Sequence, residues 1–159
     1  MKSFAKILAL ACILAPGAVY SAATCGVSTI SIVFPGYDVF VLTPADSTGT
    51  ITVTCDWPPP PPPTAPPTVT ISIGASPISG GVNPRKMKHS SKSDLLNYNL
   101  FTDAARSAIW GDATQGTSTV SKKVNKNKPW VSTVYGRIPA RQNVPVGLYS
   151  DTLTVTIMW

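Results

Sequence analysis

The sequence predicts an all-β protein, a β-sandwich of the immunoglobulin-like type. Three runs alternate apolar residues with threonine or serine, as strands do when they bury one face, and they span 51–55, 68–73 and 152–159. Turn-forming residues punctuate the chain often, since 16 Pro and 11 Gly occur in 159 residues. All seven acidic residues are Asp, and a chain without Glu lacks a main constituent of surface helices.

Weaker candidate strands complete the predicted sandwich, and these are 27–34, 39–42, 95–101, 119–124 and 131–137. Turn signals such as Pro35-Gly36 separate them. The one helix-like stretch, 103–108, is too short to be expected as a stable helix. With a mean hydropathy of +0.15, the chain is too apolar for wholesale disorder, and its length indicates one domain.

Residues 1–23 have the layout of a secretory signal peptide. Lys2 and Lys6 precede an apolar run over 7–14, and small residues at 21–23 offer a cleavage site. The apolar run is too short for a transmembrane helix. We therefore expect cleavage after Ala23 and a mature domain over 24–159. The alternative, lipid attachment at Cys12, is disfavoured because the residues before it do not follow the usual pattern.

Two cysteines remain after that cleavage, Cys25 and Cys55. An even number of cysteines in an exported chain predicts a disulfide. A loop of about 30 residues closed in this way contributes about 3–4 kcal/mol. A metal site would need more ligands than these two thiols and His89 supply, so neither a metal nor a cofactor is expected.

The segment 57–67 is compositionally unusual. Proline has no amide hydrogen, so the segment cannot form a central strand. It lies between two predicted strands and is expected to be a stiff polyproline II loop, in which the six consecutive prolines 58–63 span about 19 Å at 3.1 Å per residue. One interpretation is a plain surface loop, and the other is a projecting contact element. The candidate contact residues are Trp57, Pro58, Pro59, Pro60, Pro61, Pro62 and Pro63.

Four of the nine lysines lie within 121–128. The simplest interpretation is a solvated hairpin loop. The functional alternative is an electrostatic contact with an anionic surface polymer. No aromatic residues are interleaved with these lysines, so nucleic acid is not an expected partner.

The final alternating run, 152–159, reaches the end of the sequence without capping residues. A sandwich whose chain ends in such a strand exposes an apolar edge unless something pairs with it. Either the sheets close with the predicted strands, or another chain supplies a missing strand.

Several motifs resemble those of the spore coat protein U domain family. They include LNYNLFTD at 96–103, IWGD at 109–112 and VYGRIPA at 134–140, and the likeness extends over essentially the whole mature chain. The resemblance implies a secreted, pilin-like subunit of archaic chaperone–usher fimbriae. Its fold would be an incomplete immunoglobulin-like β-sandwich completed by a donor strand from another chain.

The same resemblance implies the partners and the location. A periplasmic pilus chaperone would lend a strand, an outer-membrane usher would pass the subunit on, and neighbouring pilin subunits would replace the chaperone. The protein would be exported through the periplasm to a cell-surface fimbria that supports adhesion to a receptor or an abiotic surface and biofilm formation. The residues expected to line the assembly groove are Leu153, Val155, Ile157 and Trp159.

Two features depart from the family pattern. Shaft subunits of the family carry a donor segment ahead of the first cysteine, whereas here only Thr24 precedes Cys25 after the predicted cleavage. The chain is therefore expected to accept a strand without giving one, which would place it at a fibre tip. The proline-rich loop is the second departure and suggests an adhesive contact. The alternative is a self-complete secreted coat or surface-binding protein that does not polymerise, a lectin-like module included.

No enzymatic activity is expected. His89, Ser90 and Asp94 form a hydrolase-like set by composition alone, since they fall within six residues of one probable loop. Asp103 and Asp112 flank turns, where a carboxylate accepts backbone amides. Arg137 and Asp151 are candidates for an ion pair. The aromatic residues expected to serve packing are Tyr98, Trp110, Tyr135 and Tyr149.

Overall fold

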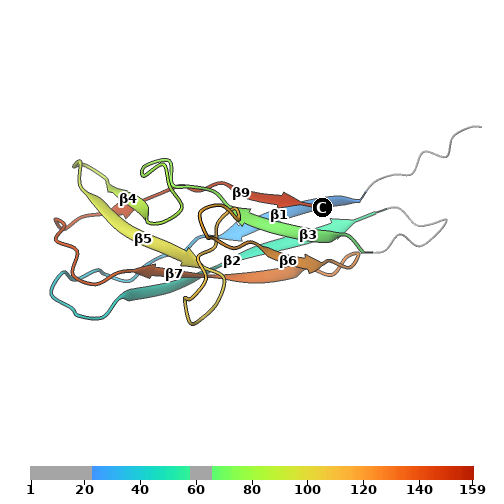
Figure 1. The fold of residues 1–159 in the computed structure, drawn as a ribbon, viewed down its shortest axis with the longest axis horizontal. Coiled ribbons are helices and arrows are strands. Elements are labelled where there is room, and N and C mark those ends of the chain that lie inside the picture. Colours follow the sequence, from blue (N-terminus) through green and yellow to red (C-terminus); the bar gives the residue numbers. More distant parts are fainter. Residues whose placement is uncertain (1–22, 58–65) are drawn as a thin grey trace, which may run out of the picture.

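The computed structural model describes residues 23–57 and 66–159, and in these ranges the chain forms nine β-strands and no helix (Figure 1). It follows that no helix capable of crossing a membrane occurs in the described ranges. The strands are β1 (Thr24–Ile30), β2 (Ala45–Asp56), β3 (Thr68–Ile73), β4 (Arg85–His89), β5 (Leu95–Phe101), β6 (Val120–Lys123), β7 (Trp130–Ile138), β8 (Tyr149–Ser150) and β9 (Val155–Met158).

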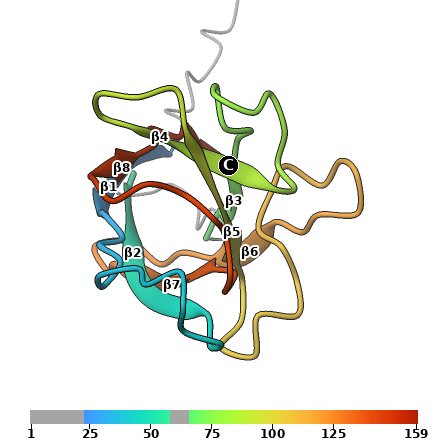
Figure 2. The same ribbon diagram turned by 90° about the vertical axis from the view of Figure 1, so that its left-hand side faces the viewer.

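The strands form two antiparallel sheets that enclose one core. The larger sheet has the order β1-β2-β7-β5-β4-β8, and the smaller sheet has the order β6-β3-β9. The larger sheet curls around the core, as the end-on view shows (Figure 2). The segment that ends the chain belongs to both sheets, because β8 pairs with β4 whereas β9 pairs with β3. This arrangement is the immunoglobulin-like sandwich that the alternating pattern predicts.

The core is built from the alternating residues of the strands. In β2 and β3 every second side chain is buried and the intervening threonines face outward or lie at the sheet surface. Trp110 is completely buried between the sheets, and its indole N–H donates to the backbone oxygen of Ile71 at 3.1 Å. The predicted strands at 51–55 and 68–73 are therefore confirmed, together with their inward faces.

Several elements differ from the prediction. The first strand, β1, spans Thr24–Ile30, so the predicted strand 27–34 extends four residues beyond its end. Residues 39–42 form a turn instead of a strand, because the Asp38 carboxylate accepts the Phe40 amide at 2.9 Å and fixes the chain direction. The last strand begins at Val155 and not at 152, because the chain crosses between the two sheets at 151–154. β4 was not predicted, since its inward residues include Arg85 and His89, which do not read as an apolar face.

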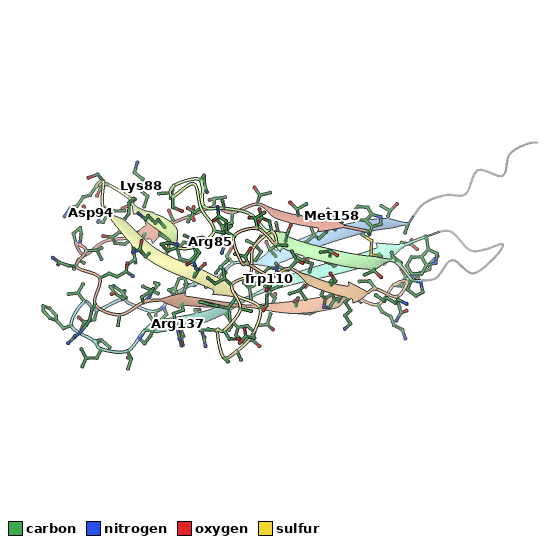
Figure 3. The ribbon with its side chains drawn as sticks, viewed as in Figure 1. Arg85, Lys88, Asp94, Trp110, Arg137 and Met158 are labelled. Atoms are coloured by element: carbon green, nitrogen blue, oxygen red, sulfur yellow. A yellow bond between two sulfur atoms is a disulfide. The ribbon has the colours of Figure 1, made fainter. Side chains whose placement is uncertain are left out.

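Arg85 connects the two sheets through the core. Its side chain is fully buried, and its guanidinium donates to the backbone oxygens of Ile73, Gly74 and Trp110 at 2.8–3.2 Å and to Asn99 Oδ1 at 3.1 Å (Figure 3). Burial lowers the pKa of the guanidinium from its ordinary value. The charge is tolerated because these acceptors replace the lost water.

The predicted disulfide is present between Cys25 and Cys55. The two residues lie directly opposite each other in the β1–β2 ladder, with a sequence separation of 30. The bond therefore holds the edge strand β1 against its neighbour β2 at one end of the molecule.

Candidate functional site

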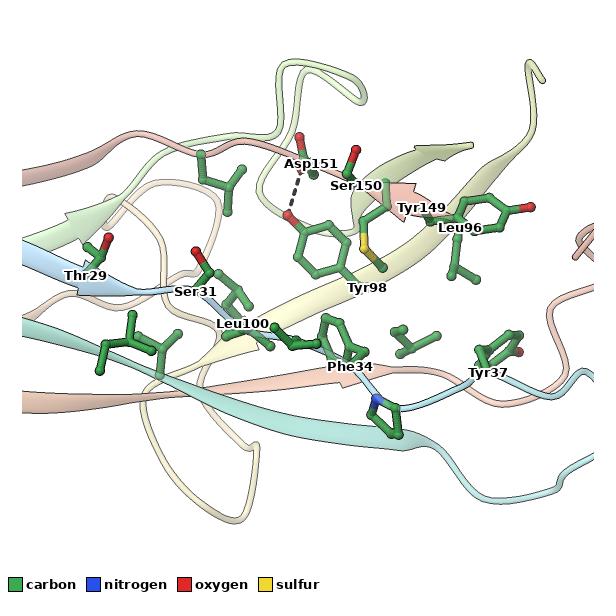
Figure 4. Close-up of a pocket in the computed structure, with 18 of the residues that line it drawn as sticks. Thr29, Ser31, Phe34, Tyr37, Leu96, Tyr98, Leu100, Tyr149, Ser150 and Asp151 are labelled. Atoms are coloured by element: carbon green, nitrogen blue, oxygen red, sulfur yellow. Dashed lines mark hydrogen bonds between the residues drawn. The ribbon is translucent and has the colours of Figure 1, made fainter. Parts of the chain in front are cut away.

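A groove of about 580 Å³ opens along one side of the sandwich (Figure 4). One wall is the end of β1 and the segment that follows it, residues 29–37, and the other wall is residues 147–155. The floor comes from the larger sheet and from β3. The apolar residues of the floor are Ile51, Ile73, Met87, Leu96, Leu100, Val134 and Ile138.

Each wall of the groove includes a free strand edge, β1 on one side and β8 and β9 on the other. Among the described residues, β1 pairs only with β2, β8 only with β4, and β9 only with β3. An edge strand carries unpaired backbone N–H and C=O groups. The groove therefore presents an apolar floor between two rows of backbone donors and acceptors, which is the surface that an additional strand requires.

The first wall lies close to the larger sheet because two glycines leave room for it. A Cβ atom at Gly49 would lie 2.6 Å from the backbone oxygen of Ile30, and one at Gly136 would lie 2.8 Å from Phe34 Cζ. Ile32 and Phe34 consequently pack on the core from inside the groove. The two glycines thus set the position of this wall.

A polar pair lies in the groove between Tyr98 and the second wall. The Tyr98 hydroxyl donates to Asp151 Oδ2 at 2.7 Å, and the Phe34 ring meets the Tyr98 ring edge-on (Figure 4). Burial, followed by the hydrogen bond to Asp151, raises the pKa of Tyr98. The phenol therefore stays neutral and acts as a donor that ties the floor to the residue after β8.

The predicted groove residues lie at different depths. Leu153 and Val155 line the groove, whereas Ile157 is half-buried, packs on the core and lies opposite Ile71 in the β3–β9 ladder. Trp159 differs from the prediction, since its side chain is 53% exposed and its indole N–H donates to the backbone oxygen of Ala23 at 2.8 Å. An indole needs an acceptor for its N–H, and here the acceptor is Ala23, the residue before β1 and the last residue of the predicted signal peptide.

The proline-rich segment begins at the disulfide end of the molecule. Trp57 is half-buried against the core, and Lys126 donates to its backbone oxygen and pairs with Asp56 at 3.1 Å. The candidate contact residues Pro58, Pro59, Pro60, Pro61, Pro62 and Pro63 lie outside the described residues. The structure therefore brings the start of the proline-rich segment and the lysine-rich segment together.

The lysine-rich segment contains the edge strand β6. Lys122 and Lys123 are exposed on β6, which pairs only with β3 among the described residues. Lysine on an edge strand discourages pairing with other chains. This edge is thus protected by charge, in contrast to the two edges beside the groove.

The acidic residues serve turns and ion pairs. The Asp103 carboxylate accepts the amides of Ser107 and Ala108, and Asp112 accepts the amide of Thr114, as predicted for turn-flanking residues. These hydrogen bonds to backbone amides lower the pKa of Asp103, and the hydroxyl and amide of Thr114 lower the pKa of Asp112.

The predicted pairing of Arg137 with Asp151 is wrong. Arg137 donates to both carboxylate oxygens of Asp46 at 2.7 and 2.8 Å, because β2 and β7 place the two residues opposite each other. Asp151 instead accepts the Tyr98 hydroxyl across the groove. Arg137 and Asp46 are 91 residues apart in the sequence, so no local pattern could have identified them as partners.

His89 and Asp94, two members of the hydrolase-like set, make hydrogen bonds with the backbone. Both ring nitrogens of His89 face backbone groups, and Asp94 contributes its backbone oxygen to the amide of His89. Within 23–57 and 66–159, no group of three or more His, Cys, Asp or Glu residues could hold a metal ion.

The sequence pattern identified one wall of the groove and missed the other. Residues 29–34 of the other wall belong to the predicted strand 27–34, with Ile32 and Phe34 among its apolar residues, but nothing in that pattern shows that the segment faces the end of the chain. Only the topology brings the two walls together.

The sandwich, with its open groove between the first strand and the last strands, has a counterpart among solved structures. It is similar to a chain in the crystal structure of the CsuC-CsuE chaperone-tip adhesion subunit pre-assembly complex from archaic chaperone-usher Csu pili of Acinetobacter baumannii. The TM-score is 0.58 at 21% identity, over 87% of this chain and 40% of that one. The family model of the Spore Coat Protein U domain matches residues 12–156, and the chain belongs to that family.

A curated relative supports this membership. Protein U of Myxococcus xanthus is 36% identical over 92 residues, which is 56% of this chain and 50% of the relative. The match therefore spans about half the length of that protein.

Proposed function

We propose that this protein is a structural subunit of a surface fimbria, assembled through the chaperone–usher pathway by accepting a β-strand from another chain. The observation that carries the proposal is the groove of about 580 Å³ with an apolar floor and a free strand edge on each side. A strand inserted there would bind backbone groups on both walls and place alternate side chains on the floor. A compact ligand would leave those edges unpaired.

The partners follow from this mechanism. A periplasmic pilus chaperone would fill the groove first, an outer-membrane usher would receive the complex, and a neighbouring pilin subunit would then supply the permanent strand. The similar crystal structure is that of a chaperone-tip adhesion subunit pre-assembly complex, which supports binding of the chaperone before assembly. The signal peptide predicted over 1–23 supports export through the periplasm to the cell surface.

A pair of substitutions on β9 tests the proposal. Val155→Asp puts a charge on the groove surface, whereas Thr156→Asp, the control, puts the same charge on the exposed face of the same strand. We expect the wild type and Thr156→Asp to co-purify with a co-expressed periplasmic pilus chaperone, and Val155→Asp to lose it. Equal recovery of chaperone with both variants, or a wild type that purifies as a stable monomer without chaperone, would instead favour a self-complete coat or surface-binding protein.

The position in the fibre is a further part of the proposal. Cleavage after Ala23 would leave Thr24 alone ahead of Cys25, too short a segment to donate a strand. We therefore place the subunit at the tip, where it would support adhesion and biofilm formation. Labelling the protein on intact fibres tests this placement, since label along the whole shaft contradicts it.

Two surfaces are candidates for the adhesive contact. One is the proline-rich segment 57–67, and the other is a pair of loops, 38–44 before β2 and 141–148 before β8, at the opposite end of the molecule from the C-terminus (Figure 1). Those loops expose apolar side chains, and the most exposed are Phe40 at 87%, Leu42 at 67%, Val146 at 98% and Leu148 at 80%. Exposed apolar groups gathered at one end indicate a contact surface.

Attachment assays with piliated cells separate the two surfaces. Deletion of 58–65 removes the six consecutive prolines and keeps Trp57, which packs against the core, whereas the double substitution Phe40→Ser and Leu42→Ser makes one apolar loop polar. If one variant loses attachment while the number of pili stays constant, the surface altered in that variant is the adhesive one. Unchanged attachment of both variants would contradict an adhesive role for either surface.

A further inference from the structure

The groove wall over 147–151 is held by few strand hydrogen bonds. β8 contains two residues, and its ladder with β4 pairs Lys88 with Ser150 and His89 with Tyr149. Beyond this ladder, the Ser90 amide donates to the backbone oxygen of Leu148 at 2.9 Å. A two-residue strand with one extra hydrogen bond needs other support to keep a fixed position.

The imidazole of His89 supplies that support. It is 5% exposed, and its Nε2 lies 3.1 Å from the backbone oxygen of Val146. Gly147 passes so close that a Cβ atom there would lie 2.0 Å from the same nitrogen. The ring also meets the Tyr149 ring edge-on, with 5.0 Å between the ring centres. His89 is therefore one of the side chains that support the loop before β8, together with the Tyr149 hydroxyl, which donates to the backbone oxygen of Pro145 at 2.8 Å.

The hydrogen bonds of the ring define its protonation state. Nδ1 accepts the backbone amides of Ser91 at 3.0 Å and Lys92 at 3.1 Å. A nitrogen that faces two N–H donors carries no proton, so the ring is neutral and Nε2 carries the hydrogen that it donates to Val146. The neutral ring thus joins the turn after β4 to the groove wall.

Protonation of Nδ1 is incompatible with the two amide contacts of the ring, whereas Nε2 can still donate to Val146, so the wall is released because the ring has to move away from the Ser91 and Lys92 amides. A hydrogen on Nδ1 would point at two N–H groups, and both nitrogens would then be donors. The charged and titratable groups around the ring are Lys88 beside it on β4, Lys92 and Asp94 in the following turn, and Tyr149 on β8. Both ring nitrogens face backbone atoms, so no carboxylate accepts the added hydrogen.

We propose that His89 is a positioning residue of the strand-binding groove: the neutral ring holds residues 145–149 in place, and protonation of Nδ1 releases this wall and weakens strand capture. The inference rests on the proposed function, since it concerns the same groove. His89 is the only histidine in the chain, so a histidine-dependent change in strand release can be assigned to this residue.

The test measures the release of a probe strand at two pH values. The mature protein is refolded with a labelled synthetic peptide of alternating valine and threonine, capped at both ends so that it carries no titratable group. Release is then followed at pH 7.5 and pH 5.0 in the presence of excess unlabelled peptide. For the wild type we expect release to be roughly fivefold faster, or more, at pH 5.0, as the loss of about one hydrogen bond predicts.

Two variants show whether the effect belongs to the histidine. His89→Asn keeps an acceptor near the Ser91 and Lys92 amides, and His89→Gln keeps a donor near Val146, but neither titrates in this range. We expect the ratio of release rates at the two pH values to be near one in both. The control Ser93→Ala, at an exposed position of the same turn, should keep the wild-type ratio.

Hydrogen exchange of the wild type adds a measurement that needs no variant. The Ser91 and Lys92 amides should lose protection between pH 7.5 and 5.0 after correction for intrinsic exchange rates. A pH-independent release of bound peptide, or an unchanged pH ratio in His89→Asn and His89→Gln, overturns the inference and leaves the proposed function intact. Failure of the wild type to bind the peptide at any pH overturns the proposed function instead, and the amide exchange then decides the role of the histidine.

Discussion

Arg85 shows how a single buried charge can hold two sheets together. Its guanidinium donates to the backbone oxygens of Ile73 on the smaller sheet and of Trp110, and to the side-chain oxygen of Asn99 on the larger sheet. Replacement by methionine keeps most of the volume but leaves these acceptors without a donor, which costs roughly 3 kcal/mol or more. We expect Arg85→Met to lower the free energy of unfolding by that amount in denaturant titrations. Lys86→Met, on the half-exposed neighbour, should change it by about 0.5 kcal/mol or less, and equal effects would contradict this role.

Asp46 makes a pH-dependent contribution at the surface. The hydrogen bond from Arg137, assisted by the charge of Arg106, lowers the pKa of this carboxyl group. A lowered native pKa stabilises the fold above the unfolded value of about 3.9, and this contribution is lost as the pH falls through the native pKa.

The substitution Asp46→Asn tests this linkage. Because the pair is partly exposed, we expect the variant to be less stable by about 0.5–1 kcal/mol at pH 7. The difference should shrink towards zero near pH 2, where the wild-type carboxyl is protonated as well. Thermal unfolding at the two pH values measures it, and a difference that is the same at both would rule out the ion pair as its source.

At the level of strands, the sequence was informative where burial follows a simple alternation. β2 and β3 alternate apolar residues with threonine, and both were predicted together with their inward faces. β4 escaped prediction because two of its three buried residues are Arg85 and His89, whose burial depends on hydrogen bonds made by distant segments. Local patterns cannot reveal partners that only the topology supplies.

The segment after β1 depends on two glycines in the neighbouring strands. At Gly49 a Cβ atom would lie 2.6 Å from a backbone oxygen, so alanine forces the groove wall to move. We expect Gly49→Ala to destabilise the fold by about 1–3 kcal/mol and to weaken strand capture. Gly26→Ala is the matched control, because a Cβ atom on β1 at that position meets nothing within 4 Å.

Chemical denaturation and peptide binding measure both glycine variants. Destabilisation that is equal in Gly49→Ala and Gly26→Ala would show that glycine matters for strand flexibility in general. Such a result would contradict the claim that the close approach of Ile30 to Gly49 fixes the position of the groove wall.

At the level of the whole molecule, only half of the groove was predictable. The alternation at the end of the chain identified Leu153 and Val155, which line it. The opposite wall, residues 29–37, lies more than a hundred positions away and became part of the same site through the order of the strands. Trp159 illustrates the limit of alternation, since the strand pattern points it inward while its N–H bonds to the start of β1.

The most direct test of the account is the stability of the purified mature protein with and without an added strand. We predict that the protein alone unfolds readily. A capped peptide of alternating valine and threonine should form a one-to-one complex and raise the midpoint of thermal unfolding as its concentration increases. A peptide of the same length with a proline at every third position should have no effect, because it cannot pair along both edges. A protein that is long-lived by itself and binds neither peptide would contradict the claim that its groove is a site for a strand from another chain.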